Sequence, residues 1–275
     1  MNRRAFVGVS AAAAAVTASN APALAQTSPL GKTHPPLVPE GDPAIVVDRA
    51  KLERPDAKID AYAAWPAGAS TSVPSVVVIM HVWGVDTSIR DVVRRLAKAG
   101  FAAIAPDLYA RFGAPSGDGA SDYTVFRPYS HRLDRAQYGD DIRAAALWLR
   151  AKFPRTKVGL LGFCMGGRIV LTQTIDNAHL FGAACPFYGP IADIDPTAVA
   201  VPVCGSYGAR DTSIPAESVL AFQSKLTVPN DFRIYDNAGH AFFDDQRPSY
   251  DAEAAADAWK RSIAFLEAHL GKPTS

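Results

Sequence analysis

An α/β fold, with a mostly parallel central sheet and helices on both faces, is predicted by three features of the sequence. Residues 75–80 (SVVVIM) form a continuous, largely β-branched run, as expected of a buried parallel strand. Residues 88–99 then place apolar side chains at helical spacing, and Gly100 ends this stripe. The strand-then-helix order repeats towards the C-terminus, which indicates parallel strands joined by right-handed crossovers.

The other elements follow from the same two patterns. We expect further strands at residues 45–47, 59–65, 101–105, 158–163, 182–187, 201–206 and 232–235. We expect further helices at residues 138–152, 165–174, 216–226 and 250–270. In an open sheet of this kind, ligands bind at the carboxyl ends of the strands. Residues that directly follow a strand are therefore the first candidates for chemistry.

Composition narrows the classes of protein to consider. The chain has 275 residues, with 28 Lys and Arg against 27 Asp and Glu, and 48% of its residues are hydrophobic. This excludes a disordered chain, and the balanced charge excludes nucleic-acid binding through a large basic surface. The sequence has no phosphate or dinucleotide motif and no metal-ligand spacing, so no cofactor and no metal are predicted. We expect a Pro-rich arm at residues 26–43, then one domain at residues 44–275, and a monomer.

Residues 1–25 are predicted to be a signal peptide rather than an N-terminal helix of the domain. Arg3 and Arg4 precede an Ala-rich apolar stretch that is too short to span a bilayer, and an A-x-A cleavage site lies at residues 23–25. The paired arginines resemble a twin-arginine signal. These features predict export to the periplasm or out of the cell, with no stable membrane anchor after cleavage.

A candidate nucleophile lies in the hexapeptide Gly162–Gly167 (GFCMGG), between a predicted strand and a predicted helix. Its form, G-x-C-x-G-G, is the nucleophile-elbow pattern G-x-S-x-G with sulfur in place of oxygen. Cys164 is expected on a tight turn that needs small neighbours, where the positive end of the next helix stabilises a thiolate. The Met165 N–H is then the natural first donor to an oxyanion. The alternative is a buried structural cysteine in a glycine-rich turn.

Two residues further along the chain can complete a catalytic triad with Cys164. Asp211 and His240 each follow a predicted strand, in the order nucleophile, acid, histidine that α/β-hydrolases show. A thiol nucleophile needs a base, and the base needs a group that orients it. We therefore predict Cys164 as nucleophile, His240 as base and Asp211 as orienting acid. Taken alone, either of the last two is more often an ordinary loop residue.

Three motifs together resemble the dienelactone hydrolase family. They are GFCMGG around Cys164, PDLY at residues 106–109, and GHAFFD at residues 239–244, which is followed by RPSY. The resemblance covers residues 44–270. It implies an α/β-hydrolase fold and a Cys-His-Asp triad that opens lactones or cleaves esters without a cofactor. It also implies a carboxymethylenebutenolidase-like activity on small, often anionic, lactones.

One departure from this family concerns the residue beside the thiol. The family usually has a glutamate at the end of the strand before the first helix, where it contacts the resting cysteine and helps to activate it. Here His81 occupies that place, in the segment HVWGV. An imidazolium there favours the thiolate, because an opposite charge lowers the pKa of a thiol. The alternative is that His81 only shapes the pocket. The Val82 N–H, which comes next, is the expected second oxyanion donor.

A second departure concerns the charge of the substrate. The best-known members hold the carboxylate of dienelactone with arginines, one of which follows the catalytic histidine by four residues. Here that place is Asp244, which is expected to repel an anion. Arg127 and Tyr129 lie where the family supplies an anion-binding arginine and a tyrosine, although such arginines are usually solvated surface. Trp83 and Phe242 are candidates for the pocket wall, with the core as the alternative.

Together these features predict an exported hydrolase that cleaves a lactone or a small ester through an acyl-thioester on Cys164. Two alternatives stay open. The first is a general carboxylesterase or thioesterase without a preference for lactones, which the changes at His81 and Asp244 favour. The second is a non-catalytic binding protein that keeps the fold and the pocket, since a fold alone does not establish a function. The expected partner is a small molecule, and no nucleic acid is expected.

Overall fold

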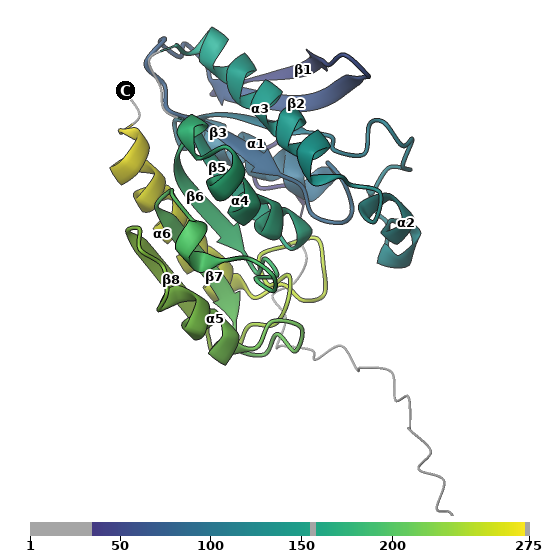
Figure 1. Ribbon diagram of the computed structural model, residues 1–275. Helices are drawn as coiled ribbons and strands as arrows, with labels where there is room; N and C mark the ends of the chain where they lie inside the picture. The colour runs from purple at the N-terminus through teal and green to yellow at the C-terminus, as the bar shows by residue number, and fades with distance from the viewer. Residues whose placement is uncertain (1–34, 155–157, 273–275) are drawn as a thin grey trace, which may run out of the picture.

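The computed structural model describes residues 35–154 and 158–272, which form one sheet flanked by helices (Figure 1). The strands are Ile45–Glu53 (β1), Lys58–Pro66 (β2), Ser75–Ile79 (β3), Ala102–Pro106 (β4), Val158–Phe163 (β5), Phe181–Phe187 (β6), Val203–Gly208 (β7) and Asn230–Tyr235 (β8). Their order in the sheet is β1-β2-β4-β3-β5-β6-β7-β8. β2 is antiparallel to β1 and to β4, and the other neighbours are parallel. The predicted fold class is therefore confirmed.

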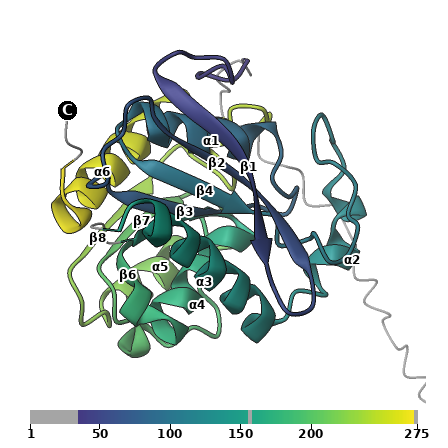
Figure 2. The same ribbon diagram turned by 90° about the horizontal axis from the view of Figure 1, so that it is seen from above.

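Helices cover both faces of the sheet. They are Thr87–Lys98 (α1), Arg127–Ser130 (α2), Arg135–Lys152 (α3), Met165–Asp176 (α4), Ala216–Gln223 (α5) and Ala252–Leu270 (α6). Seen from above, α1 and α6 lie on one side of the strands, whereas α3, α4 and α5 lie on the other (Figure 2). The short α2 stands at the edge of the molecule, in the connection between β4 and α3 (Figure 1).

Some bounds differ from the sequence prediction, for local reasons. β1 runs to Glu53 rather than residue 47, because all nine of its residues pair in register with β2. α3 begins at Arg135 rather than residue 138, because the Asp134 carboxylate caps the helix by accepting the Gln137 N–H. The single turn of α2 was not predicted, since four residues are too few for a periodic pattern.

The sheet changes its winding direction beside β3, and this creates the crevice in which ligands bind to such sheets. The chain passes from β3 to β4 on one side and returns to β5 on the other side. Gly166, in the first turn of α4, lets the helix lie directly against the end of β3. A Cβ atom at Gly166 would lie 2.5 Å from the carbonyl oxygens of Ile79 and Met80. The residues after β3 and the start of α4 are therefore neighbours.

The segment before β1 is fastened to α1. The Asp91 carboxylate accepts the N–H groups of Leu37 (3.1 Å) and Val38 (2.9 Å), and the Val38 side chain is buried. The described part of the predicted arm thus lies against the domain. The predicted signal peptide at residues 1–25 lies outside the described residues. In the part of the chain that the structure describes, no helix is both long and apolar enough to cross a membrane.

Candidate active site

Cys164 occupies a strained turn between β5 and α4. Its φ is 53°, in the left-handed region that side chains other than glycine rarely adopt. The turn is held by a hydrogen bond from the Cys164 N–H to the Phe187 carbonyl (3.0 Å). Met165 is the first residue of α4, and its N–H donates to the Cys164 sulfur. The sulfur therefore lies at the positive end of a helix.

Asp211 and His240 lie beside this turn, although both are distant from it in the sequence. The Nδ1 atom of His240 is 2.7 Å from the Asp211 carboxylate, and the other side of the His240 ring is hydrogen-bonded to Cys164. The second Asp211 oxygen accepts three hydrogen bonds, from the Ser213 N–H (2.9 Å), the Ser213 hydroxyl (2.6 Å) and the Ile214 N–H (3.2 Å). Asp211 is thus held in a fixed direction, and it orients the histidine.

The electrostatics of the three residues favour a thiolate–imidazolium pair. Burial raises the pKa of Cys164, but the hydrogen bond and the charge of His240 outweigh it, so that the thiol pKa is lowered. Burial lowers the pKa of His240, but the hydrogen bonds to Asp211 and Cys164 outweigh it and raise the pKa to about 10. Because the charge on Cys164 and the charge on His240 stabilise each other, the two groups titrate as a pair. Both shifts favour the charged forms of the two groups, a negative sulfur and a positive ring.

His81 is buried next to this pair, inside a cluster of four ionisable groups. Its Nε2 atom is 3.0 Å from Asp86, and its Nδ1 atom is 3.5 Å from Asp244. The Arg247 guanidinium lies between the same carboxylates, 3.3 Å from Asp86 and 3.4 Å from Asp244. Burial lowers the pKa of His81, but the charges of Asp86 and Asp244 outweigh it, so that the pKa is raised. The cluster thus places an imidazole whose positive form is favoured, together with a guanidinium, against two carboxylates.

This cluster corrects one expectation from the sequence. Asp244 is only 3% exposed and is paired with His81 and Arg247, so it does not present a negative charge to an incoming substrate. In the sequence, His81 and Asp244 look like two separate departures from the family pattern. In the structure they are the two ends of one ion pair.

Val82 and Met165, the predicted oxyanion donors, are held together by a residue that the sequence analysis did not select. The Tyr109 hydroxyl donates to the Val82 carbonyl (3.1 Å) and lies 3.7 Å from the Met165 sulfur. Among the described residues, neither donor N–H has a backbone acceptor. The signal for Tyr109 was present in the PDLY motif, but nothing in that motif indicates what the hydroxyl contacts.

Comparison with known proteins identifies the family. Residues 59–270 match the sequence profile of the dienelactone hydrolase family. The chain belongs to this family. It is 35% identical over 260 residues to an Escherichia coli (strain K12) protein that is provisionally named a carboxymethylenebutenolidase, covering 89% of this chain and 94% of the relative. A relative with the same provisional name from Synechocystis is 35% identical over 230 residues, covering 78% and 93%.

Solved structures agree with this assignment. A provisionally named dienelactone hydrolase from Klebsiella pneumoniae superposes with a TM-score of 0.74 at 32% identity, covering 81% of this chain and 98% of that one. A dienelactone hydrolase-like promiscuous phosphotriesterase from metagenomic libraries gives 0.69 at 26% identity, covering 83% and 100%. The chain is therefore a hydrolase of the dienelactone hydrolase family with the α/β-hydrolase fold.

The residues predicted to bind substrate in this hydrolase occupy different environments. Trp83 is half-buried, and its ring centroid lies 5.5 Å from that of Phe126. The Arg247 guanidinium lies over the Trp83 ring, 3.8 Å from its centroid. Arg127 is exposed at the start of α2. Tyr129 is half-buried, and its ring centroid is 6.1 Å from that of Tyr109. Of these, Tyr129 is linked to the site through Tyr109.

Phe242 belongs to the core and not to the pocket wall. Its side chain is fully buried, with ring centroids 5.3 Å from Tyr188 and 5.2 Å from Tyr235. The preceding Ala241 has a φ of 60°, which turns the chain after His240. Tyr188, which the sequence analysis missed, places its ring edge-on to His240 with 5.2 Å between centroids. These aromatic rings form the support behind the histidine.

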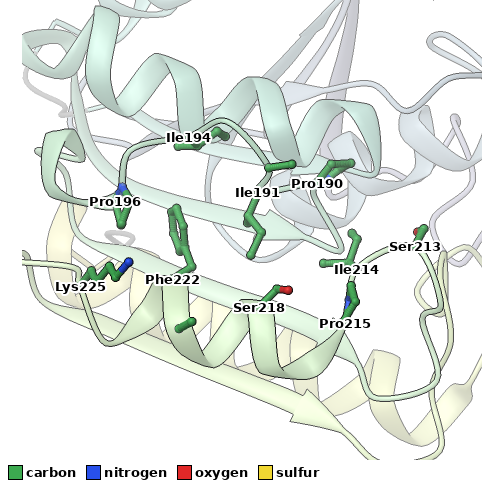
Figure 3. A pocket seen from close by; sticks show the side chains of 12 residues that line it. Pro190, Ile191, Ile194, Pro196, Ser213, Ile214, Pro215, Ser218, Phe222 and Lys225 are labelled. Atoms are coloured by element: carbon green, nitrogen blue, oxygen red, sulfur yellow. The ribbon is translucent and has the colours of Figure 1, made fainter.

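A groove lies next to the Asp211 loop but outside the triad. It encloses about 370 Å³ between α5 and the loop that follows β6 (Figure 3). Ser213 and Ile214, which hold the Asp211 carboxylate, form one end, and Lys225 lies at the other. Cys164 and His240 do not line this groove. It therefore adds nothing to the chemistry of the triad.

Proposed function

We propose that this hydrolase cleaves a lactone or a small ester, with Cys164 as the nucleophile. The observation that carries the proposal is the arrangement of three side chains. Cys164 lies on a strained elbow at a helix N-terminus and is hydrogen-bonded to His240, whose Nδ1 atom is 2.7 Å from Asp211. A buried structural cysteine needs neither the strain nor the oriented base.

The reaction follows from these positions in two steps. The Cys164 thiolate attacks the carbonyl carbon, the carbon–oxygen bond breaks, and the His240 imidazolium gives its proton to the leaving alkoxide. The product is an acyl-thioester and neutral His240. His240 then takes a proton from water, whose oxygen attacks the thioester, and the acid and the thiolate are released. The N–H groups of Val82 and Met165 receive the oxyanion in both steps, and each donor contributes roughly 10²–10³ in rate.

His81 sets the resting state of the nucleophile in this mechanism. Where the family pattern has a glutamate, this chain has an imidazole whose positive form Asp86 and Asp244 favour. A carboxylate beside Cys164 would disfavour the thiolate, whereas an imidazolium stabilises it. The thiolate is therefore present before the substrate binds.

A general esterase or thioesterase activity is the second candidate, and one observation favours it. The place from which the family's arginine holds a substrate carboxylate is taken by Asp244, which is buried against His81. Arg247, the other cation in this cluster, is already bound to two carboxylates and to the Ala120 carbonyl. This favours uncharged substrates over the anionic dienelactone.

A substrate panel tests both candidates. The wild-type protein and Cys164→Ala are assayed on a dienelactone, a neutral lactone and an uncharged aryl ester, with and without iodoacetamide. Thiol-dependent preference for the dienelactone supports the family activity, and thiol-dependent cleavage of the neutral compounds alone supports the general esterase. Cleavage that survives in Cys164→Ala contradicts the cysteine mechanism. If none of the three compounds is cleaved, the non-catalytic alternative is favoured.

A further inference from the structure

Tyr109 is a buried residue to which the mechanism above assigns no role, yet its hydroxyl meets both residues of the oxyanion hole. It donates to the Val82 carbonyl at 3.1 Å and lies 3.7 Å from the sulfur of Met165. The side chain is only 2% exposed. Val82 follows β3 and Met165 begins α4, so one oxygen atom joins two separate parts of the fold.

The backbone of Tyr109 is fixed independently of the two parts that its hydroxyl joins. The Asp107 carboxylate accepts the Tyr109 N–H (2.9 Å), and the Tyr109 carbonyl accepts the Phe112 N–H (2.8 Å). The Tyr109 ring packs over Gly84, where an added Cβ would lie 3.7 Å from a ring carbon, and beside Tyr129. Tyr109 is therefore anchored at the end of β4 and can act as a fixed reference point.

The turn that carries Val82 needs such a reference. It leaves β3 at Ile79 and closes on itself where His81 and Gly84 form an isolated antiparallel bridge, with the Gly84 N–H donating to the His81 carbonyl (3.1 Å). The Gly84 bond holds the peptide that carries the Val82 N–H, and the hydrogen bond from Tyr109 holds the next peptide, which carries the Val82 carbonyl. Together they fix both peptides that flank the Val82 Cα, so that the Tyr109 bond restrains the backbone from which the Val82 N–H projects. The contact with the Met165 side chain sets the distance from this N–H to the donor on α4.

We propose that Tyr109 is a positioning residue that sets the spacing and direction of the two oxyanion donors, Val82 N–H and Met165 N–H. The proposal rests on the hydrolytic function proposed above. Tyr109 does not serve as a third donor, because a tyrosine hydroxyl has one hydrogen and the Val82 carbonyl takes it. Burial raises the pKa of Tyr109, so the hydroxyl keeps that hydrogen throughout the pH range of an assay.

The test compares a reaction that forms an oxyanion with one that does not. Hydrolysis of p-nitrophenyl acetate passes through an oxyanion, whereas alkylation of Cys164 by iodoacetamide is a direct displacement at carbon and needs only the thiolate. Tyr109→Phe removes one oxygen atom and keeps the ring contacts. We expect it to lower kcat about 10- to 100-fold, since misplaced donors lose most of their effect. KM and the alkylation rate should stay within about two-fold.

Tyr138→Phe is the matched control. The Tyr138 hydroxyl is also buried, and it pairs with Thr172 (3.2 Å). Removing the Tyr138 hydroxyl should lower the melting temperature about as much as removing the Tyr109 hydroxyl does. It should change neither kcat nor the rate of Cys164 alkylation. A second variant, Met165→Leu, keeps the side-chain volume and removes the sulfur contact, and it should lower kcat by a smaller factor, again without changing alkylation.

Two results would overturn the proposal. One is a kcat for Tyr109→Phe within two-fold of the wild type. The other is an equal loss in kcat and in alkylation, which would place the effect on Cys164 instead of on the oxyanion donors. Failure of the proposed function looks different. In that case wild-type hydrolysis is absent or survives blocking of Cys164 by iodoacetamide, and the role of Tyr109 falls with the cysteine mechanism.

Discussion

Replacing Asp211 by asparagine should reverse the tautomer of His240, and the geometry of the carboxylate explains why. One Asp211 oxygen accepts three hydrogen bonds from Ser213 and Ile214, while the other faces His240 Nδ1 at 2.7 Å. In Asp211→Asn, only the carbonyl oxygen can satisfy the three donors, so the amide NH₂ must face the histidine. Nδ1 then accepts a hydrogen bond, and the ring proton moves to Nε2. A neutral His240 in this state cannot take a proton from Cys164 or from water.

The size of the effect follows from the distance. Two unit charges 2.7 Å apart attract by about 6 kcal/mol at an effective dielectric constant of about 20. Since the His240 side chain is 33% exposed, solvent screens part of this attraction, and we take about 4 kcal/mol as the loss. This corresponds to a decrease in kcat of roughly 10³.

Two measurements check this prediction. The first is kcat at pH 7 on an uncharged aryl ester. The second is the rate of Cys164 alkylation against pH, whose inflection should move upward because an unpaired His240 no longer stabilises the thiolate. Asp195→Asn is the matched control. This exposed carboxylate accepts the N–H (2.9 Å) and the hydroxyl (2.7 Å) of Thr197, just as Asp211 accepts the N–H and the hydroxyl of Ser213. A kcat for Asp211→Asn within ten-fold of wild type, or an unmoved inflection, would refute the reasoning.

Three further outcomes are expected. Gly166→Ala should destabilise the fold by about 3 kcal/mol, because its Cβ would meet two carbonyl oxygens at 2.5 Å. Gly139→Ala, with no neighbour nearer than 3.5 Å, should instead stabilise α3 by about 0.5–1 kcal/mol. Equal urea midpoints for the two variants would contradict this. His81→Gln should cost about 3 kcal/mol, and adding Asp244→Asn should recover part of it. Because the folded pKa of His81 is raised above 6.5, its contribution to stability is full below about pH 6.5 and declines as the pH rises through the folded value; a wild-type advantage that grows from pH 6 to pH 9 would have the wrong sign. Cys164→Ala should abolish ester cleavage with a nearly unchanged melting temperature, and a large drop in that temperature would point to a structural cysteine.

Local patterns in the sequence were enough to select the two residues, Asp211 and His240, that the structure places in a row with Cys164. Glycines mark the elbow, and the order of Asp211 and His240 after strands places them at the same edge of the sheet. Phe242, two positions after His240, could not be assigned to the core or to the pocket wall from the sequence. Its burial accompanies the left-handed conformation of Ala241, which no sequence pattern indicates.

Contacts between loops could not be predicted in the same way. The ion pair between His81 and Asp244 and the hydrogen bond from Tyr109 to Val82 join segments that meet only when the strands are in order. No periodicity or spacing in the chain specifies which side chains face each other across the end of β3. Such contacts depend on the topology of the sheet, which places three separate loops around one crevice.

The buried charge cluster constrains how this protein can change over evolutionary time. His81 and Asp244 have the opposite polarity to the glutamate and arginine of the family pattern, and both are buried. Changing only one of them brings like charges together or leaves a charge without a partner, either of which costs several kcal/mol. A lineage can therefore pass between the two arrangements only if both positions change together, or through an ancestor in which one of them is neutral. Homologous sequences should accordingly keep the two positions as a matched pair.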